Sequence, residues 1–452
     1  MEEMVFLNWT KNFIFKNNLV LKTLSVLPER FLFHKMYFDI IALNKKYEKD
    51  EDKNAVRMVL RKQLMFVLRN SLRNVKYYRE NIRINPNDIN EENVYDMLLK
   101  FPYLNKKTIM ANKQDFVDER ISRFALHYGT SGGSTGQGVG IFRTKKEYDI
   151  EKAFFKYEWG KYGFSQFKSR IIKIGTEARR NSDEDPLRFI GNRLLISPYH
   201  LNMEWIEKIY DSFMKFQAEF IDTYPSCLEY IARYIQETKK NCPKFKCIFL
   251  GSEMVTDYQY DLFKQVFDSP IKISYGLTER TNFAFSYDVQ SDDKFYYKLN
   301  DIYGYSENRE NSFGEFEIVG TSYWNIAMPL IRYCTQDYGK IENGIIKKID
   351  GRNQEFLIGK RGERIPGFSL KVDEFTWDFV DIYQVVQNEK GKLVLKIVPK
   401  VNFTNEISKS LLDKQVERWG GFFDMSIDVV DSIERTKSGK LRLIVNNIGL
   451  TK

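Results

Sequence analysis

The chain has 452 residues and a formal net charge of +9, the balance of 70 basic and 61 acidic side chains. A chain of this length exceeds what a single hydrophobic core usually covers, so two or three domains are expected. The charge is spread thinly and provides no basic arm for nucleic acid. The small excess suits an anionic ligand such as a nucleotide, or no special partner.

The N-terminal sequence predicts neither a signal peptide nor a membrane anchor. It places two acids before its apolar residues and has no small-residue cleavage site. No apolar run approaches the ~20 residues that span a bilayer, so no transmembrane segment is expected. Segment Phe31–Leu43 is apolar enough to lie on a membrane or partner surface, or to form a helix packed on the body of the protein. Four cysteines without CxxC spacing, beside three histidines, favour a reduced, cytoplasmic protein without a zinc site.

Residues 1–100 are expected to form a helical region packed on a large domain. Between Ala55 and Asn81, apolar residues recur at three- and four-residue steps, which predicts one long amphipathic helix. From about Phe124 to Tyr338 the pattern changes to short β-rich runs separated by helical stretches. The expected strands are Arg170–Gly175, Lys246–Gly251, Ile271–Tyr275 and Glu315–Val319, and the expected helices are Trp205–Phe216, Cys227–Thr238 and Asp257–Phe267.

This alternation of strands and helices predicts an α/β domain with a mainly parallel sheet covered by helices. Ligands of such sheets bind beyond the carboxyl ends of the strands. From about residue 352 the pattern indicates a small α+β domain. Its expected elements are strands at Tyr383–Gln387, Leu393–Val398 and Met425–Val430 and a helix at Glu406–Trp419.

Segment Tyr128–Gly140 carries the first chemical signal. Four hydroxyl residues among six glycines suit a loop whose backbone N–H groups and hydroxyls surround phosphate oxygens. The segment lacks the Gly-Lys-Ser/Thr ending of a Walker loop and the GxGxxG spacing of a dinucleotide fingerprint. A flexible linker is the alternative, but apolar residues flank the segment on both sides. The sequence therefore favours phosphate binding.

Four further signals follow along the chain. Strand Ile271–Tyr275 leads into Gly276, Thr278 and Glu279, which could contact a phosphate and hold magnesium through a carboxylate, or form an ordinary solvated turn. Asp337, after Pro329-Leu-Ile-Arg, could accept hydrogen bonds from ribose hydroxyls. Arg352 offers a cationic fork nearby, although surface ion pairs are the alternative. Lys440, on a Ser-Gly turn, could reach a separate active site or remain a mobile, solvated lysine.

Together and in this order, the segments resemble the core motifs of the adenylate-forming superfamily, which includes acyl-CoA synthetases, adenylation domains and luciferases. The resemblance is closer to the phenylacetate–CoA ligase-like branch and to its capsular-polysaccharide-biosynthesis group. The motifs that carry it are Thr130-Ser-Gly-Gly-Ser-Thr-Gly136, Tyr275-Gly-Leu-Thr-Glu-Arg280, Arg332-Tyr-Cys-Thr-Gln-Asp337 and Arg435-Thr-Lys-Ser-Gly-Lys440. The family fold implies a large N-terminal domain whose residues 101–351 bind ATP and a carboxylic acid, and a mobile C-terminal lid formed by residues 352–452.

The resemblance also implies residue roles. The phosphate loop would comprise Thr130, Ser131, Gly132, Gly133, Ser134, Thr135 and Gly136. Other nucleotide contacts would come from Gly251, Ser252, Glu253, Tyr275, Gly276, Asp337 and Arg352. Thr278, Glu279 and Lys440 would be catalytic, with Glu279 holding Mg²⁺. His200 and Tyr224 would line the acid pocket, as alternatives to packed side chains.

By the same resemblance, the expected reaction joins a small-molecule carboxylic acid to AMP from ATP. The acyl group then passes to a CoA thiol, in a role connected with surface polysaccharide. Transfer to a carrier protein or to a sugar amine or hydroxyl remains open. A nucleotide-binding scaffold without turnover is the alternative from another class, although retention of Glu279, Asp337 and Lys440 together argues against it.

Overall fold

The structure, a computed structural model, describes residues 27–130, 139–178, 184–289, 293–312, 314–349, 351–352, 356–366, 370, 374–436 and 440–448. Residues 131–136 of the expected phosphate loop lie outside the described residues, as does the side chain of Thr130. The hairpin that leads into and out of this segment is described. It consists of antiparallel strands β1 (His127–Thr130) and β2 (Gly140–Arg143).

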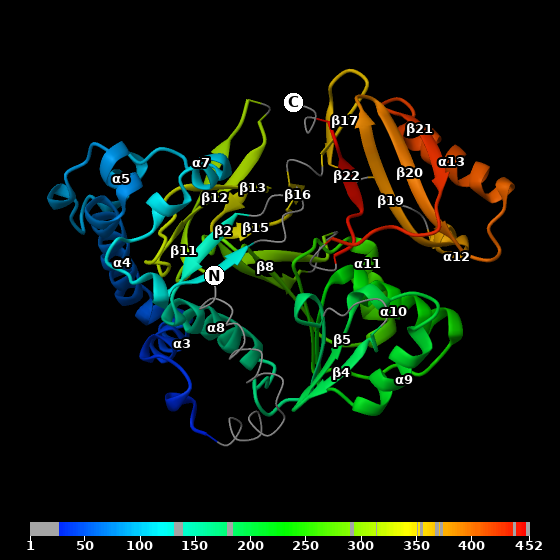
Figure 1. The fold of residues 1–452 in the computed structure, drawn as a ribbon, viewed down its shortest axis with the longest axis horizontal. Helices are drawn as coiled ribbons and strands as arrows, with labels where there is room; N and C mark the ends of the chain where they lie inside the picture. Colours follow the sequence, from blue (N-terminus) through cyan, green and yellow to red (C-terminus); the bar gives the residue numbers. More distant parts are fainter. Residues whose placement is uncertain are drawn as a thin grey trace.

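Helices gather at the N-terminal end of the chain (Figure 1). They are α3 (Lys35–Tyr47), α4 (Lys53–Asn74), α5 (Lys76–Asn81), α6 (Val94–Leu99) and α7 (Lys106–Ala111). Helix α3 packs on α8 (Lys145–Gly160) and buries Tyr37 and Ile40 completely. Of the two interpretations of Phe31–Leu43, the helix packed on the body is confirmed for α3.

The prediction of a single helix over Ala55–Asn81 was wrong at one residue, Val75. Val75 adopts an extended conformation, with φ −115° and ψ 112°, and separates α4 from α5. It forms an isolated β-bridge with Asp118 and is fully buried. The apolar spacing continues through this position, so the periodicity gives no sign of the break.

A ten-stranded sheet forms the centre of the molecule, in the order β14-β15-β10-β9-β8-β7-β6-β3-β5-β4. Its middle five strands are parallel: β8 (Ile271–Gly276), β7 (Cys247–Gly251), β6 (Phe220–Thr223), β3 (Ile171–Ile174) and β5 (Arg193–Ile196). Antiparallel strands extend both edges: β4 (Leu187–Ile190), and β9 (Phe283–Asp288), β10 (Phe295–Leu299), β15 (Ile345–Ile346) and β14 (Ile341–Glu342). The α/β class is confirmed, with the parallel pairing confined to the centre.

Both faces of the parallel strands are covered by other elements. Successive side chains of a strand point to opposite faces, so neighbouring residues belong to different cores. Ile172, Ile221 and Ile248 belong to a core shared with α9 (Ile206–Phe216), α10 (Pro225–Thr238) and α11 (Asp257–Phe267). Their neighbours Ile171, Phe220 and Phe249 pack instead with Trp159 of α8. The Trp159 and Phe249 rings stack 4.1 Å apart.

The predicted strand at Glu315–Val319 exists but belongs to a different sheet. It is part of β12 (Phe316–Ser322), which lies in an antiparallel sheet with β11 (Gly304–Glu310), β13 (Tyr333–Tyr338) and β16 (Gly351–Arg352). This second sheet places the Asp337 segment beside the central sheet. Its membership depends on pairing with distant strands, which the local pattern does not encode.

The C-terminal strands and helix agree with the expected α+β pattern and form a separate unit (Figure 1). The sheet contains β19 (Val380–Glu389), β20 (Lys392–Pro399), β21 (Asp424–Val429) and β22 (Ile444–Asn446), and α13 (Asn405–Trp419) covers it. Strands β17 (Phe356–Ile358) and β18 (Arg364–Pro366) form a small hairpin, and α12 (Glu374–Phe379) precedes β19. Among the helices that the structure describes, none has the length and apolar character to cross a membrane.

Candidate active site

The sequence-predicted residues meet at one edge of the central sheet. Gly175, Tyr224, the Gly251–Glu253 segment and Tyr275 lie at or just after the carboxyl ends of β3, β6, β7 and β8. Because these strands are parallel neighbours, their carboxyl ends share one edge. A Cβ at Gly175 would lie 3.3 Å from the Tyr224 ring, so the glycine allows this ring to lie close to the strand end.

Tyr275 and Asp337 come from different sheets and are joined directly. The Tyr275 hydroxyl donates a hydrogen bond to Asp337 Oδ2 at 3.0 Å. Asp337 is only 4% exposed, which rules out the surface ion pair considered for it. Its strand β13 pairs with β16, where Asp337 lies opposite Arg352. A buried carboxylate beside an aromatic ring suits a sugar diol below a flat base.

Glu279 is held by a residue to which the sequence assigned no role. The Tyr333 hydroxyl donates to Glu279 Oε1 at 2.8 Å, and Glu279 is only 7% exposed. The alternative of a solvated glutamate was therefore wrong. Thr278, one residue earlier, is half-buried on the same turn. Tyr333 lies inside a motif that the sequence singled out, but nothing in the pattern shows which group its phenol reaches.

The surroundings of Glu279 suit a magnesium ion whose other ligands come mainly from a nucleotide and water. No group of three or more His, Cys, Asp or Glu side chains within the described ranges could hold a metal ion. Glu279 would therefore supply one carboxylate, while phosphate oxygens and water supply the remaining ligands, which is usual for Mg²⁺ with phosphates.

Lys440 reaches this edge from the C-terminal unit. Its Nζ donates to the Ser252 carbonyl oxygen at 2.8 Å and lies 5.7 Å from the centre of the Tyr224 ring. The Lys440 loop is closed by a hydrogen bond from Thr436 N to the Lys440 carbonyl oxygen at 2.9 Å. The Tyr199 hydroxyl donates to the Thr436 carbonyl oxygen, also at 2.9 Å, and ties the loop to the segment after β5. Lys440 therefore has a defined partner at this edge, in a hydrogen bond that is exposed to solvent.

Glu253 and His200 are shielded polar groups near the same strand ends. Glu253 Oε2 accepts a hydrogen bond from Ser226 N, at the start of α10, at 3.0 Å. Burial raises the pKa of Glu253, while this backbone hydrogen bond acts in the opposite direction. His200 is 2% exposed and packs edge-on against Trp205. Neither ring nitrogen of His200 has a hydrogen-bond partner among the described residues.

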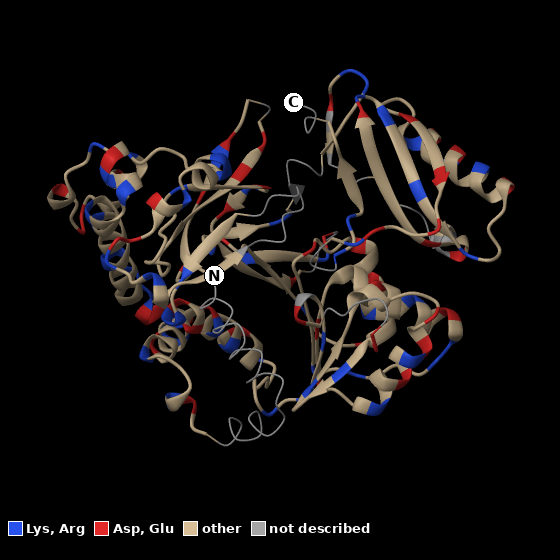
Figure 2. Cartoon of the chain, in the orientation of Figure 1, with Lys and Arg blue, Asp and Glu red and all other residues tan. Residues whose placement is uncertain are grey.

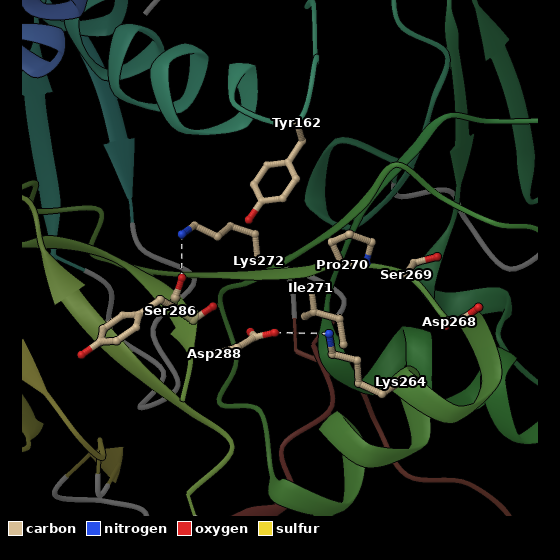
Figure 3. Close-up of a pocket in the computed structure, with 10 residues that line it drawn as sticks. Tyr162, Lys264, Asp268, Ser269, Pro270, Ile271, Lys272, Ser286 and Asp288 are labelled. Atoms are coloured by element: carbon tan, nitrogen blue, oxygen red, sulfur yellow. Dashed lines mark hydrogen bonds and ion pairs between the residues drawn. The ribbon is translucent and has the colours of Figure 1, made fainter. Parts of the chain in front are cut away.

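A cavity of about 420 Å³ lies elsewhere and contains no sequence-predicted site residue (Figure 3). It opens at the amino end of β8, beside Asp268–Lys272, whereas the predicted residues lie at the carboxyl end of that strand. Lys272 Nζ donates to the Ser286 carbonyl oxygen at 2.6 Å, and Lys264 pairs with Asp288 at 3.3 Å. The lysines of this cavity already have partners, so the cavity is not the candidate active site.

Charged residues of both signs are distributed along the part of the chain that the structure describes. Figure 2 shows lysines and arginines interspersed with acidic residues over the helices and the C-terminal sheet.

Comparison with solved structures decides the fold. The structure of 2-hydroxyisobutyryl-CoA ligase in the postadenylation state with 2-HIB-AMP matches with a TM-score of 0.62 at 13% identity, over 86% of this chain and 88% of that one. The same ligase with R3-HIB-AMP gives a TM-score of 0.61 at 14% identity, with the same coverage. The chain has the fold of the adenylate-forming ligases. The resemblance to the adenylate-forming superfamily that the motifs predicted is confirmed at the level of the fold.

Sequence comparison identifies a family model and a curated protein that are similar to this chain. Residues 357–447 match the family model of the CapK C-terminal domain. Protein CapK of Staphylococcus aureus is 23% identical over 397 residues, which cover 83% of this chain and 86% of that protein. The similarity to CapK therefore extends well beyond the C-terminal unit.

Proposed function

We propose that this protein activates a carboxylic acid with ATP, forming an acyl-adenylate and releasing pyrophosphate. The observation that carries the proposal is the convergence of Lys440 with the strand ends of the central sheet, through its 2.8 Å hydrogen bond to Ser252. The adenylate-forming fold supports this chemistry. A scaffold that only binds nucleotide would not require a lysine from the C-terminal unit at this edge.

In this proposal the nucleoside lies between Tyr275 and the Gly251–Glu253 segment. The ribose hydroxyls donate to Asp337, whose carboxylate is oriented by the Tyr275 hydroxyl. The backbone of Arg352 lies opposite Asp337 across the β13–β16 pair. The side chain of Arg352 lies outside the described residues, so its contact with the nucleotide stays a prediction. Gly276 follows Tyr275 and leads the chain into the Thr278–Glu279 turn. The phosphate-binding role of residues 130–136 stays a prediction.

The reaction requires positioning and charge stabilisation, without a covalent enzyme intermediate. A carboxylate oxygen of the acid attacks the α-phosphorus of ATP. The bond from that phosphorus to the bridging oxygen breaks, and the electron pair leaves with pyrophosphate. Lys440 balances the negative charge shared by the acid and the α-phosphate, and Thr278 donates to a phosphate oxygen. Glu279 would hold Mg²⁺, which would supply positive charge to offset that of the phosphates.

The acid would enter beside Tyr224 and His200. Tyr224 lies below Lys440 and is 7% exposed, so its ring can form an apolar wall next to the reacting carboxylate. The ring nitrogens of His200 lack hydrogen-bond partners among the described residues. They can donate a hydrogen bond to a bound acid or accept one from it.

The acyl acceptor is proposed to be the thiol of CoA, since 2-hydroxyisobutyryl-CoA ligase shares this fold. A carrier-protein thiol or a sugar amine or hydroxyl is the second candidate, and a role in surface polysaccharide biosynthesis stays a prediction. For the second step the C-terminal lid, proposed to begin at residue 352, would rotate. Lys440 would then leave, and the Lys360–Arg364 segment would approach.

The test is exchange of labelled pyrophosphate into ATP by the purified chain, with Mg²⁺ and a panel of aryl, hydroxy and amino acids. Exchange that depends on one class of acid supports the proposal and identifies the substrate class. Binding of ATP without exchange for any acid in the panel would support the scaffold instead.

A further inference from the structure

Two buried arginines lie behind the β1–β2 hairpin. Arg143, the last residue of β2, is 7% exposed, and Arg280, which directly follows Glu279, is 9% exposed. A Cβ at Gly129 would overlap the Arg143 guanidinium, so this group lies directly against β1. Both guanidinium groups contact the ring of Tyr148, with their central carbons 4.7 Å and 5.0 Å from its centre.

The carboxylates around this pair leave an excess of positive charge. Glu151 lies 3.5 Å from Arg280 Nε and also accepts a hydrogen bond from the Tyr303 hydroxyl at 2.7 Å. Glu147 accepts hydrogen bonds from three backbone N–H groups, of Thr144, Ile326 and Ala327. Among the described ion pairs, Glu151 is the one carboxylate that pairs with either guanidinium group, and it pairs with Arg280.

The excess charge is costly for the fold. Arg143 Nε is buried and has no hydrogen-bond partner among the described residues. Burial and the neighbouring Arg280 both lower the pKa of Arg143. Removing like charges from water without full pairing is unfavourable, and such arrangements are found mostly where function requires them. Arg143 also donates a hydrogen bond to the Tyr148 hydroxyl at 3.3 Å, a neutral partner that does not balance its charge.

The pair lies next to segments that the proposed function assigns to phosphate. Arg143 and Gly129 belong to the strands that flank residues 131–138, a segment whose sequence contains neither lysine nor arginine. Arg280 has a positive φ of 57° and anchors the Thr278–Glu279 turn to α8 through a 2.8 Å hydrogen bond to the Glu147 carbonyl oxygen. The two guanidinium groups therefore lie beside β1, which leads into this segment, and beside the turn that carries Glu279.

We infer that Arg143 and Arg280 form a cationic pair that stabilises the pyrophosphate portion of ATP, and the pyrophosphate that leaves. This inference rests on the proposed function for the identity of the anion. The pair acts on the terminal phosphates and not on the adenosine, which Tyr275 and Asp337 would hold at the other end of the site. If the two arginines only stabilised the fold, their replacement would weaken the binding of pyrophosphate and of AMP alike, or of neither.

The experiment measures the binding of magnesium pyrophosphate and of AMP separately, by calorimetry on the full chain. In Arg143→Gln and Arg280→Gln we expect the dissociation constant for pyrophosphate to rise at least about tenfold, equivalent to about 1.4 kcal/mol. The AMP constant should stay within about twofold, because AMP carries only the α-phosphate. Arg143→Lys, which keeps the charge, should recover part of the pyrophosphate affinity.

Arg193→Gln is the matched control. Arg193 is also 9% exposed, but it lies at the start of β5 and pairs with Glu177 at 3.0 Å. Its replacement should leave both constants unchanged. Pyrophosphate affinity unaltered in a folded Arg143→Gln or Arg280→Gln variant, or lost in parallel with AMP affinity, would overturn the inference. The two variants lie on different elements, so one folded variant suffices. A wild-type chain that binds neither ligand would instead refute the proposed function.

Discussion

Replacing Lys440 with alanine removes an ammonium group that lies 2.8 Å from the Ser252 carbonyl oxygen, beside the proposed reaction centre. Two opposite unit charges about 4 Å apart, at an effective dielectric constant of about 20, attract each other by roughly 4 kcal/mol. Loss of that stabilisation from the transition state slows the chemical step by about a thousandfold. The lysine contacts only the reacting groups in the proposed complex, so ATP affinity should change by less than about threefold, or ~0.6 kcal/mol.

The assay is exchange of labelled pyrophosphate into ATP with the acid found active for the wild-type chain, alongside ATP binding measured by calorimetry. Lys392→Ala is the control, because Lys392 lies on the far turn of the same C-terminal sheet and pairs only with Glu389 at 2.7 Å among the described contacts. The control should retain full exchange. Exchange at the wild-type rate in Lys440→Ala would remove this lysine from the mechanism. A large loss of ATP affinity would show that it serves binding instead.

Three further predictions concern the nucleotide, the metal and the fold. Asp337→Asn should raise the dissociation constant for AMP by about tenfold, since hydrogen bonds to a charged group contribute about 1.5–3 kcal/mol; an unchanged constant from calorimetry would place the ribose elsewhere. Glu279→Gln should raise the Mg²⁺ concentration that gives half-maximal exchange, and an unaltered titration would assign the metal to another ligand. Lys173 and Arg193 lower the pKa of Glu177 from 4.5 to about 2. The stability that Glu177 contributes is therefore complete above pH 4.5 and is lost as the pH falls toward 2. Urea unfolding should show wild type and Glu177→Gln converging over that range, whereas a constant difference would contradict the assignment.

The fold could be predicted where local patterns suffice. Helix α11 and strands β20 and β21 lie close to their expected bounds, because amphipathic spacing and β-branched runs are local signals. Strand β19 is longer than expected at both ends, and β22 was not predicted. The antiparallel extension through β9 and β10 was not predicted. These aromatic-rich segments join the sheet by pairing with β8, with each other and, for β10, with β15. Val75 shows the same limit, since its extended conformation is set by a bridge to Asp118.

The candidate site divides in the same way. Residue types within motifs indicated Tyr275, Glu279, Asp337 and Lys440, but the contacts among them and their neighbours depend on how distant segments pack. Tyr275 reaches Asp337 across 62 residues, and Lys440 reaches Ser252 across 188. The hydrogen bond from the Tyr333 hydroxyl to Glu279 forms only because the second sheet lies against the turn after β8.

The most direct test of the account is a crystal structure of the chain with bound AMP. We predict the adenosine beside Tyr275 and the Gly251–Glu253 segment, with the ribose hydroxyls on Asp337 and the phosphate within reach of Lys440. AMP bound instead in the cavity between Lys264 and Lys272, without contact to Asp337 or Lys440, would contradict the account.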